Sequence, residues 1–316
     1  MRIISLVVEG LERAAEAGCL EWLWTQDADI ICLQDTHCSE YSLSGDRFFP
    51  AHYHPYFLDH FEDARLNGVA IYCKKIPKAI IWGLGFEKFD TQGLYIQADY
   101  DQVSVGSVLV PSALSGEQAM AHKLAFLNQL SGHLEKVRHK RRGYILCGGW
   151  ELMAHHADAE EVSNTGITLG LSPKERGWLL DLYDSGYADA FRVIDGEPEA
   201  LTWWPHGDEA GGMRTDTHII SELLVSAVKK VHIYDAQAFS HHAPVVIDYD
   251  ITLLPLLSAA RCAALMSAPA AVASCSNSAN SACVKVAPSA VPCTSTKPPS
   301  SVSTTFMSLS ARESSA

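Results

Sequence analysis

Short apolar stretches alternate with longer amphipathic ones along the first 250 residues, and this alternation predicts a mixture of strands and helices. The stretch Tyr144–Gly149 has four apolar residues that lead into two glycines, which predicts a buried strand with a sharp exit. The other predicted strands are Arg2–Val8, Asp29–Leu33, His52–Leu58, Gly68–Cys73, Leu94–Tyr100, Val103–Val110, Leu201–Trp204, Asp216–Leu224 and Val245–Tyr249.

Helical spacing of apolar residues predicts helices over Leu11–Gln26, over Gln118–Val137, and from Pro173 to about Ser185. The third of these begins well, because Ser172 stands at the capping position and Pro173 at the first helical position. Strands and helices in this order favour an α/β fold, a two-sheet α/β sandwich, over a simple parallel sheet.

Composition divides the chain into two parts. Residues 1–256 have the composition of one globular domain, whereas residues 257–316 consist largely of Ala, Ser, Pro, Thr and Val, with Phe306 as the one aromatic residue. Such a segment buries too little apolar surface to offset the entropy that ordering costs. We therefore expect a disordered Ala/Ser/Pro-rich tail over 257–316.

The predicted domain is strongly acidic. Residues 1–256 keep 20 of the 24 basic and 36 of the 37 acidic residues, a net charge of −16. This charge repels a phosphate backbone at long range and disfavours unaided, sequence-independent DNA binding. No CxxC pair occurs among the nine cysteines, which disfavours a zinc site. Without a signal-peptide pattern or a run of membrane-spanning length, we expect a cytoplasmic protein that does not enter membranes.

The predicted strand ends carry short motifs that together resemble the endonuclease/exonuclease/phosphatase family, in particular its exonuclease III-like members. The resemblance covers about residues 1–250 and implies the same two-sheet sandwich. In chain order the motifs are Ile4-Ser5, Leu33-Gln34-Asp35-Thr36, Pro111, Gly148, Glu175-Arg176-Gly177-Trp178, Gly186 to Arg192, Trp203-Trp204, Arg214-Thr215-Asp216 and Ser240 to Pro244.

The resemblance also implies which residues an active relative needs. There, a carboxylate-held metal polarises the phosphate, while an Asp and an Asn orient the attacking water. In this chain Asp216 and His242 match the family pattern, and Asp35 is a shortened form of the metal-binding Glu. The remaining site positions have changed, and they are occupied by Val7, Glu9, Leu109, Gly149, Glu151 and His241.

One branch of the family, the catabolite repression control proteins, has this kind of altered site. Segments that resemble it are Leu33 to Thr36, Gly83 to Glu87, Pro111 to Glu117, Trp203 to Pro205 and Ser240 to Asp250. This resemblance implies a noncatalytic translational repressor that acts with the RNA chaperone Hfq on A-rich messenger RNA sites, without a cofactor or a DNA substrate. The alternative is a weak metal-dependent nuclease or phosphodiesterase that uses Asp35, Asp216 and His242 with Mg²⁺ as its cofactor.

Basic residues gather in one run before the central strand, and a second pair lies further along the chain. They form a candidate RNA- or partner-binding stripe: Lys136, Arg138, Lys140, Arg141, Arg142, Lys229 and Lys230. Alternatively, these cations only stabilise the C-terminus of the predicted helix, where positive charge is favourable, and the sequence favours neither interpretation. In the same way, Trp203 and Trp204 either stack on bases or pack in the core, and Asp216 and His242 either catalyse or form a structural pair.

Overall fold

The computed structural model describes residues 1–154, 170, 172–194, 200–205 and 211–254, so the predicted tail at 257–316 lies outside the described residues. Within the described part, twelve strands form two six-stranded sheets. The first sheet has the order β11 (Val228–Ile233), β12 (Val245–Tyr249), β1 (Arg2–Val7), β2 (Ile30–Gln34), β4 (Val69–Cys73) and β3 (His54–Leu58). The second has the order β5 (Ala79–Trp82), β6 (Tyr95–Asp99), β7 (Val103–Leu109), β8 (Gly143–Gly149), β10 (Asp216–Ser221) and β9 (Tyr187–Asp189).

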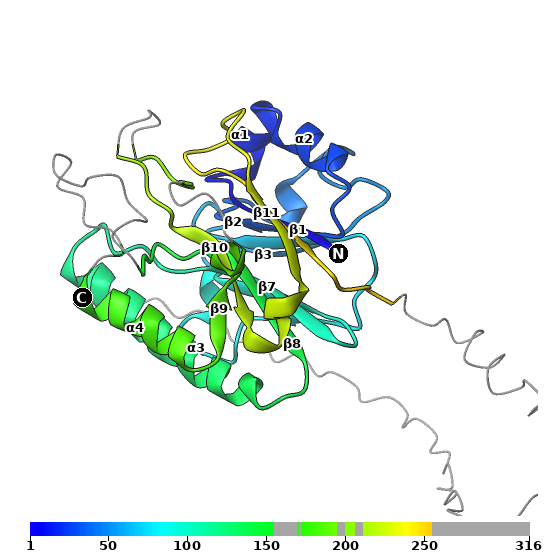
Figure 1. Cartoon of the computed structure of the whole chain (residues 1–316). Coiled ribbons are helices and arrows are strands. Elements are labelled where there is room, and N and C mark those ends of the chain that lie inside the picture. The colour runs from blue at the N-terminus through cyan, green and yellow to red at the C-terminus, as the bar shows by residue number, and fades with distance from the viewer. Residues whose placement is uncertain (155–169, 171, 195–199, 206–210, 255–316) are drawn as a thin grey trace, which may run out of the picture. The chain divides into compact units, whose positions relative to one another are not determined.

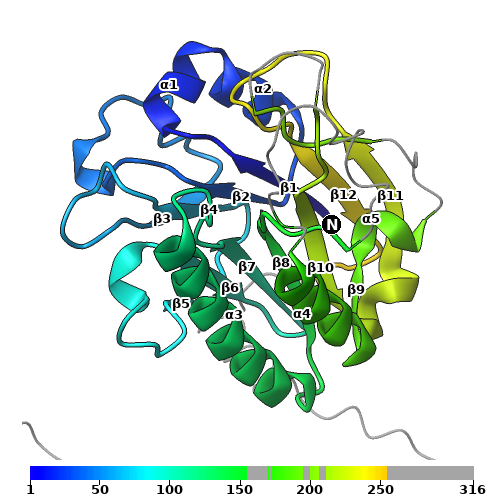
Figure 2. The same ribbon diagram turned by 90° about the vertical axis from the view of Figure 1, so that its left-hand side faces the viewer.

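Each sheet contains one parallel pair at its centre, β1 with β2 and β7 with β8, and the other neighbouring strands are antiparallel. Helices cover the outer faces of both sheets (Figures 1 and 2). Helices α1 (Leu11–Glu16) and α2 (Cys19–Thr25) pack on the first sheet, and α3 (Glu117–Arg138) and α4 (Pro173–Asp184) pack on the second. The shorter helical elements are α5 (Ala190–Val193), η1 (Glu40–Ser42), η2 (Asp90–Gln92) and η5 (Glu222–Ala227).

Three apolar clusters hold these layers together, because each sheet is apolar on both faces. One cluster lies between the sheets, and it includes Ile3, Ile30, Ile71, Val105 and Ile145. The second cluster joins α1 and α2 to the first sheet, and the third joins α3 and α4 to the second. The predicted two-sheet α/β sandwich is therefore confirmed. None of the helices in the described part is long and apolar enough to cross a membrane.

Several predicted elements differ in detail from those observed. The predicted helix over Leu11–Gln26 is two helices, because Gly18 adopts a left-handed conformation with φ of 88° between them. The predicted strand over Leu201–Trp204 is wrong, since Trp203 makes only isolated bridges to Met213 and His242. Strands β5, β9 and β11 are additional. The predicted start of α4 is confirmed, where Ser172 and Glu175 form a reciprocal capping box.

Candidate functional site

The ends of four central strands meet at one edge of the sandwich. Strand β8 ends at Gly149, which lies opposite Leu109 of β7 on one side and Asp216 of β10 on the other. Strand β1 of the facing sheet ends at Val7, and β2 ends beside it at Gln34. The motifs that contain Gln34, Gly148 and Asp216 thus lie at the same edge.

Val7 fills the space in front of Gly149. A β-carbon built on Gly149 would lie 2.6 Å from Cγ2 of Val7, closer than two carbon atoms can approach, and 3.4 Å from Oδ1 of Asp216. Val7 itself is buried, with 5% of its surface exposed. The two changed positions are therefore complementary, because the valine occupies the volume that any side chain at position 149 needs.

Asp216 and His242 form a buried pair. Nδ1 of His242 lies 2.8 Å from Oδ2 of Asp216, and the hydroxyl of Thr215 donates to the same carboxylate oxygen at 3.2 Å. The ring of Trp203 packs 6.0 Å from that of His242, and Trp203 is 9% exposed. For Trp203, this burial favours core packing over base stacking.

The charge of His242 depends on Asp216. Burial disfavours the imidazolium, but the charge and hydrogen bond of Asp216, together with the charges of Glu9 and Glu151, outweigh burial, so the pKa of His242 lies above its ordinary value of 6.5. The change Asp216→Asn should therefore lower the pKa of His242, as measured by NMR titration of the ring protons. Because the folded-state pKa is raised, the pair stabilises the fold fully below about pH 6.5 and loses this effect as pH rises through the raised value.

The destabilisation caused by Asp216→Asn should accordingly be larger at pH 5.5 than at pH 8.5. A matched control is Asp250→Asn, which removes an exposed carboxylate 3.8 Å from Lys229 and should leave the titration of His242 unchanged. Equal pKa values for His242 in the wild type and the Asp216→Asn variant would contradict the assigned interaction.

Two further carboxylates at this edge are held by histidines. Oε2 of Glu9 lies 2.8 Å from Nδ1 of His241, and Oδ1 of Asp35 lies 2.9 Å from Nε2 of His37. Glu9, Asp35 and His37 all have positive φ, so the loops keep strained conformations of the kind that gather at active sites. The resemblance alone could not reveal these pairs, because their partners lie far apart in the sequence or outside the family motifs.

A catalytic metal of the kind that the family resemblance implies does not fit these residues. Glu9 and Asp35 are each engaged by an imidazole, and the position after Gly148 offers no oxygen ligand. Among the described residues, no three His, Cys, Asp or Glu side chains are arranged to hold a metal ion. These residues therefore do not support a metal-assisted step at this site.

Glu151, just beyond β8, faces a buried lysine. Lys123 of α3 donates to the backbone oxygen of Glu151 at 2.7 Å, and its ammonium lies 3.8 Å from the Glu151 carboxylate. The same ammonium lies 2.7 Å from Glu175, and neither Lys123 nor Glu175 has any exposed side-chain surface. Burial raises the pKa of Glu151, although Lys123 and a hydrogen bond from Ser112 oppose the shift. Glu151 is thus held by Lys123 beyond the end of β8, close enough to His242 for the two charges to interact.

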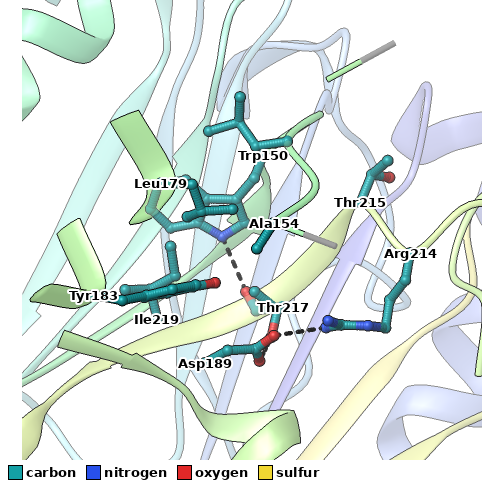
Figure 3. Close-up of a pocket in the computed structure, with 10 residues that line it drawn as sticks. Trp150, Ala154, Leu179, Tyr183, Asp189, Arg214, Thr215, Thr217 and Ile219 are labelled. Atoms are coloured by element: carbon teal, nitrogen blue, oxygen red, sulfur yellow. Dashed lines mark hydrogen bonds and ion pairs between the residues drawn. The ribbon is translucent and has the colours of Figure 1, made fainter. Parts of the chain in front are cut away.

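A second buried ion pair, between Arg214 and Asp189, contacts the first residues of β10. Arg214 lies 2.8 Å from Asp189, whose other oxygen accepts from the hydroxyl of Thr217, and the indole of Trp150 donates to the Thr217 carbonyl at 3.1 Å (Figure 3). The cavity between these side chains measures about 10 Å³, which is room for about one water molecule. This network positions the strand that carries Asp216, and it leaves no space for a substrate.

The predicted basic stripe lies at the opposite end of β8. Helix α3 ends at Arg138 and β8 begins at Gly143, so the seven residues of β8, about 20 Å of strand, separate the run from Gly149. Arg138 pairs with Glu135 at 2.7 Å, and Arg142 pairs with Asp99 at 3.0 Å. A cavity of about 700 Å³ beside the run is lined by Arg138, His139, Arg142, Tyr144, Asp184, Ser185, Gly186, Ser221, Glu222 and Leu223.

The free cations of the run are Lys136, Lys140 and Arg141, which are exposed and make no side-chain ion pair with the described residues. Lys229 follows η5, which contacts both β8 and β11, so it lies at the same end of the sandwich. Lys230 instead lines a different cavity, beside α2. The structure therefore groups most of the predicted stripe at one end, with Lys230 apart from it.

Comparison with known proteins places the chain in a family. The model described as "Endonuclease/Exonuclease/phosphatase family" matches residues 9–233, and the chain belongs to this family. Within it, the chain is similar to exonuclease III-like proteins. It is 26% identical over 253 residues to the DNA repair nuclease APEX1 of Danio rerio, covering 78% of this chain and 81% of the relative. It is 27% identical over 257 residues to the exodeoxyribonuclease of Bacillus subtilis (strain 168), covering 79% and 100%.

Solved structures support the same fold. An AP endonuclease from Archaeoglobus fulgidus superimposes with a TM-score of 0.71 at 20% identity, covering 79% of this chain and 100% of that one. The 3′-5′ exonuclease NExo from Neisseria meningitidis superimposes with a TM-score of 0.68 at 22% identity, again covering 79% and 100%. At these identities the likeness establishes the arrangement of the sheets and helices alone.

Proposed function

We propose that this chain is a noncatalytic member of its family that represses translation, binding A-rich messenger RNA together with Hfq. The observation that carries this proposal is the packing of Val7 against Gly149, because it closes the place where family members carry their water-orienting aspartate. The pairing of Glu9 with His241 and of Asp35 with His37 supports the same interpretation, since it engages carboxylates that a metal would need. The identity of the RNA and of the partner rests on the resemblance to the catabolite repression control branch.

The charge distribution favours RNA binding through a partner. A domain with a net charge of −16 does not attract phosphates at long range. The exposed cations Lys136, Lys140 and Arg141 can still neutralise phosphates once a partner has brought the RNA close. Weak contacts are then sufficient, because tethering raises the effective concentration of the RNA.

The first test is a cleavage assay of the purified protein on abasic and nicked DNA with Mg²⁺ or Mn²⁺, beside an active exodeoxyribonuclease. We expect no metal-dependent product above the background. The comparisons with known proteins favour the second candidate function, slow metal-dependent hydrolysis, over the first, because the relatives are named as nucleases. The intact Asp216–His242 pair supports the same candidate. Cleavage that requires Mg²⁺ and disappears in a His242→Asn variant would establish that candidate instead.

The second test is a gel shift on an A-rich RNA with this protein alone, Hfq alone and both together. We expect a ternary complex only with both proteins. The variant Lys140→Glu/Arg141→Glu should weaken that complex by about tenfold or more, because each reversal replaces a phosphate contact by repulsion. The control Arg47→Glu/Lys88→Glu makes the same change of charge at exposed positions elsewhere and should have little effect. Tight binding without Hfq, or equal effects of the two variants, would argue against the proposed complex.

A further inference from the structure

A third cavity lies on the outer face of the first sheet, beneath α2. It measures about 150 Å³, and its lining residues are Arg2, Trp22, Gln26, Lys230, His232, Tyr234, Val246 and Asp248. It shares no lining residue with the cavity beside the basic run. Because it involves neither the strand ends around Gly149 nor that run, binding at this cavity can be tested separately from the function proposed above.

Strand register explains the floor of this cavity. Lys230 of β11 lies opposite Asp248 of β12, which lies opposite Arg2 of β1, so the three side chains form one row on the same face. Arg2 holds both carboxylate oxygens of Asp248, at 2.7 and 3.0 Å, and donates to the backbone oxygen of Gln26. The carboxylate is therefore occupied, whereas Lys230 is exposed and makes no ion pair with the described residues.

Aromatic rings form the wall of the cavity. Trp22 of α2 and Tyr234 lie with their ring centroids 4.4 Å apart at an interplanar angle of 31°, and both rings are half-buried. Phe239 supports both from the interior, with centroids 5.4 Å from Trp22 and 6.0 Å from Tyr234. The cavity thus offers a rigid aromatic surface beside a cation.

We propose that this cavity binds one nucleotide, with its base against Trp22 and Tyr234 and its phosphate on Lys230. The volume of about 150 Å³ lies below the roughly 300–1,000 Å³ of sites that enclose whole drug-sized ligands, which matches a single ring system. Aromatic side chains stack on any base, and a lysine is a point charge suited to phosphate. A neutral sugar fits less well, because the one carboxylate that could accept its hydroxyls is held by Arg2.

His232 adds a second polar group on the phosphate side. It stands two residues after Lys230 on β11, where side chains of alternate residues share a face, and it is exposed at the same cavity. Lys229 lies instead at the irregular point of β11, where the register shifts between Val228 and Lys230, and it does not line the cavity. The chain therefore contains two adjacent lysines of which one belongs to the site.

The test is a calorimetric titration of the full chain, without Hfq, using AMP, adenosine and a short oligoadenylate. We expect AMP to bind saturably and adenosine, which lacks the phosphate, to bind more weakly. Lys230→Glu should weaken AMP binding about tenfold or more, and the control Lys88→Glu, at an exposed lysine outside this cavity and outside the basic stripe, by less than about twofold. Tyr234→Leu should also weaken it by about tenfold, and thermal melting confirms that each variant is folded.

The two sources of such a ligand are separated by the same titrations. If AMP binds, the site is assigned to free mononucleotides. If AMP does not bind but the oligoadenylate binds and this binding depends on Lys230, the site is assigned to a nucleotide within a strand. Affinities on the order of 10⁻⁴ M for isolated contacts are too weak to produce a gel shift, so this test and that of the RNA complex can fail separately. The proposal is overturned if neither ligand saturates, if adenosine binds as tightly as AMP, or if both lysine variants weaken binding equally.

Discussion

Gly149→Asp is expected to destabilise the fold and to leave the protein without nuclease activity, although it supplies the aspartate that the family resemblance implies at that position. The new β-carbon would lie 2.6 Å from Cγ2 of Val7, so the strand ends or the valine must shift. Overpacking of this kind costs about 1–3 kcal/mol. The added carboxylate would also stand beside Asp216, where a second negative charge is unfavourable.

Urea denaturation of four variants measures this effect: Gly149→Asp, Val7→Ala, the double variant and a control. The matched control is Gly132→Asp, since Gly132 lies in α3 and a β-carbon there meets nothing within 4 Å. In the double variant Val7→Ala/Gly149→Asp, the smaller side chain makes room, and we expect part of the lost stability to return. Non-additivity of the two changes is the signature of their contact.

Cleavage of abasic DNA completes the experiment. Neither the single nor the double variant should cleave, because Glu9, Leu109, Glu151 and His241 still differ from the residues that the family resemblance implies for an active site. Two results would contradict the account of the site: robust cleavage by Gly149→Asp, or equal stability of Gly149→Asp and Gly132→Asp.

The layered fold could be predicted from the sequence because most strands are short apolar runs closed by glycine or polar residues. Strand β8 and the capping box of α4 are examples of strong local signals. The break at Gly18 was missed because apolar spacing continues across it, and only the left-handed backbone divides the helix. Strand β11 was missed because it is an edge strand with Lys229, Lys230 and His232 exposed, so it lacks an apolar run.

From the sequence, a feature of the site could be predicted only where it depends on the identity of a single residue. A glycine at position 149 removes a functional group wherever it lies, and that could be inferred from the sequence alone. That Val7 fills the vacated space depends on the packing of two sheets. Lys123 shows the same limit, because it lies on a helix with an exposed side and nothing local distinguishes it from a surface lysine.

Lys123→Met is expected to be among the most destabilising single changes in the domain. The Lys123 ammonium is wholly buried, 2.7 Å from the Glu175 carboxylate and bonded to the backbone of Glu151. Removing it leaves carboxylates in the interior without a cation, and breaking a buried pair in this way costs about 3–5 kcal/mol. The loss of Lys123 should weaken both the start of α4, which Glu175 caps, and the end of β8, which Glu151 follows.

The pH dependence of this loss follows from Glu151. Burial already raises its pKa, and Lys123 is the largest influence that lowers it, so the variant should raise it further. A carboxyl group with a raised folded-state pKa stabilises the fold below its unfolded pKa of about 4.3 and loses this effect as pH rises through the folded value. The destabilisation by Lys123→Met should therefore be smaller at pH 5 than at pH 8.

Denaturant titrations at both pH values test this prediction against two further variants. Lys136→Met changes an exposed lysine of the same helix and should alter the free energy of unfolding by no more than about 0.5 kcal/mol. The double variant Lys123→Met/Glu175→Gln removes one stranded charge yet keeps an amide that can complete the capping box, so it should recover part of the loss. If Lys123→Met is no more destabilising than Lys136→Met, the buried ammonium does not join α3, α4 and the end of β8 as the geometry indicates.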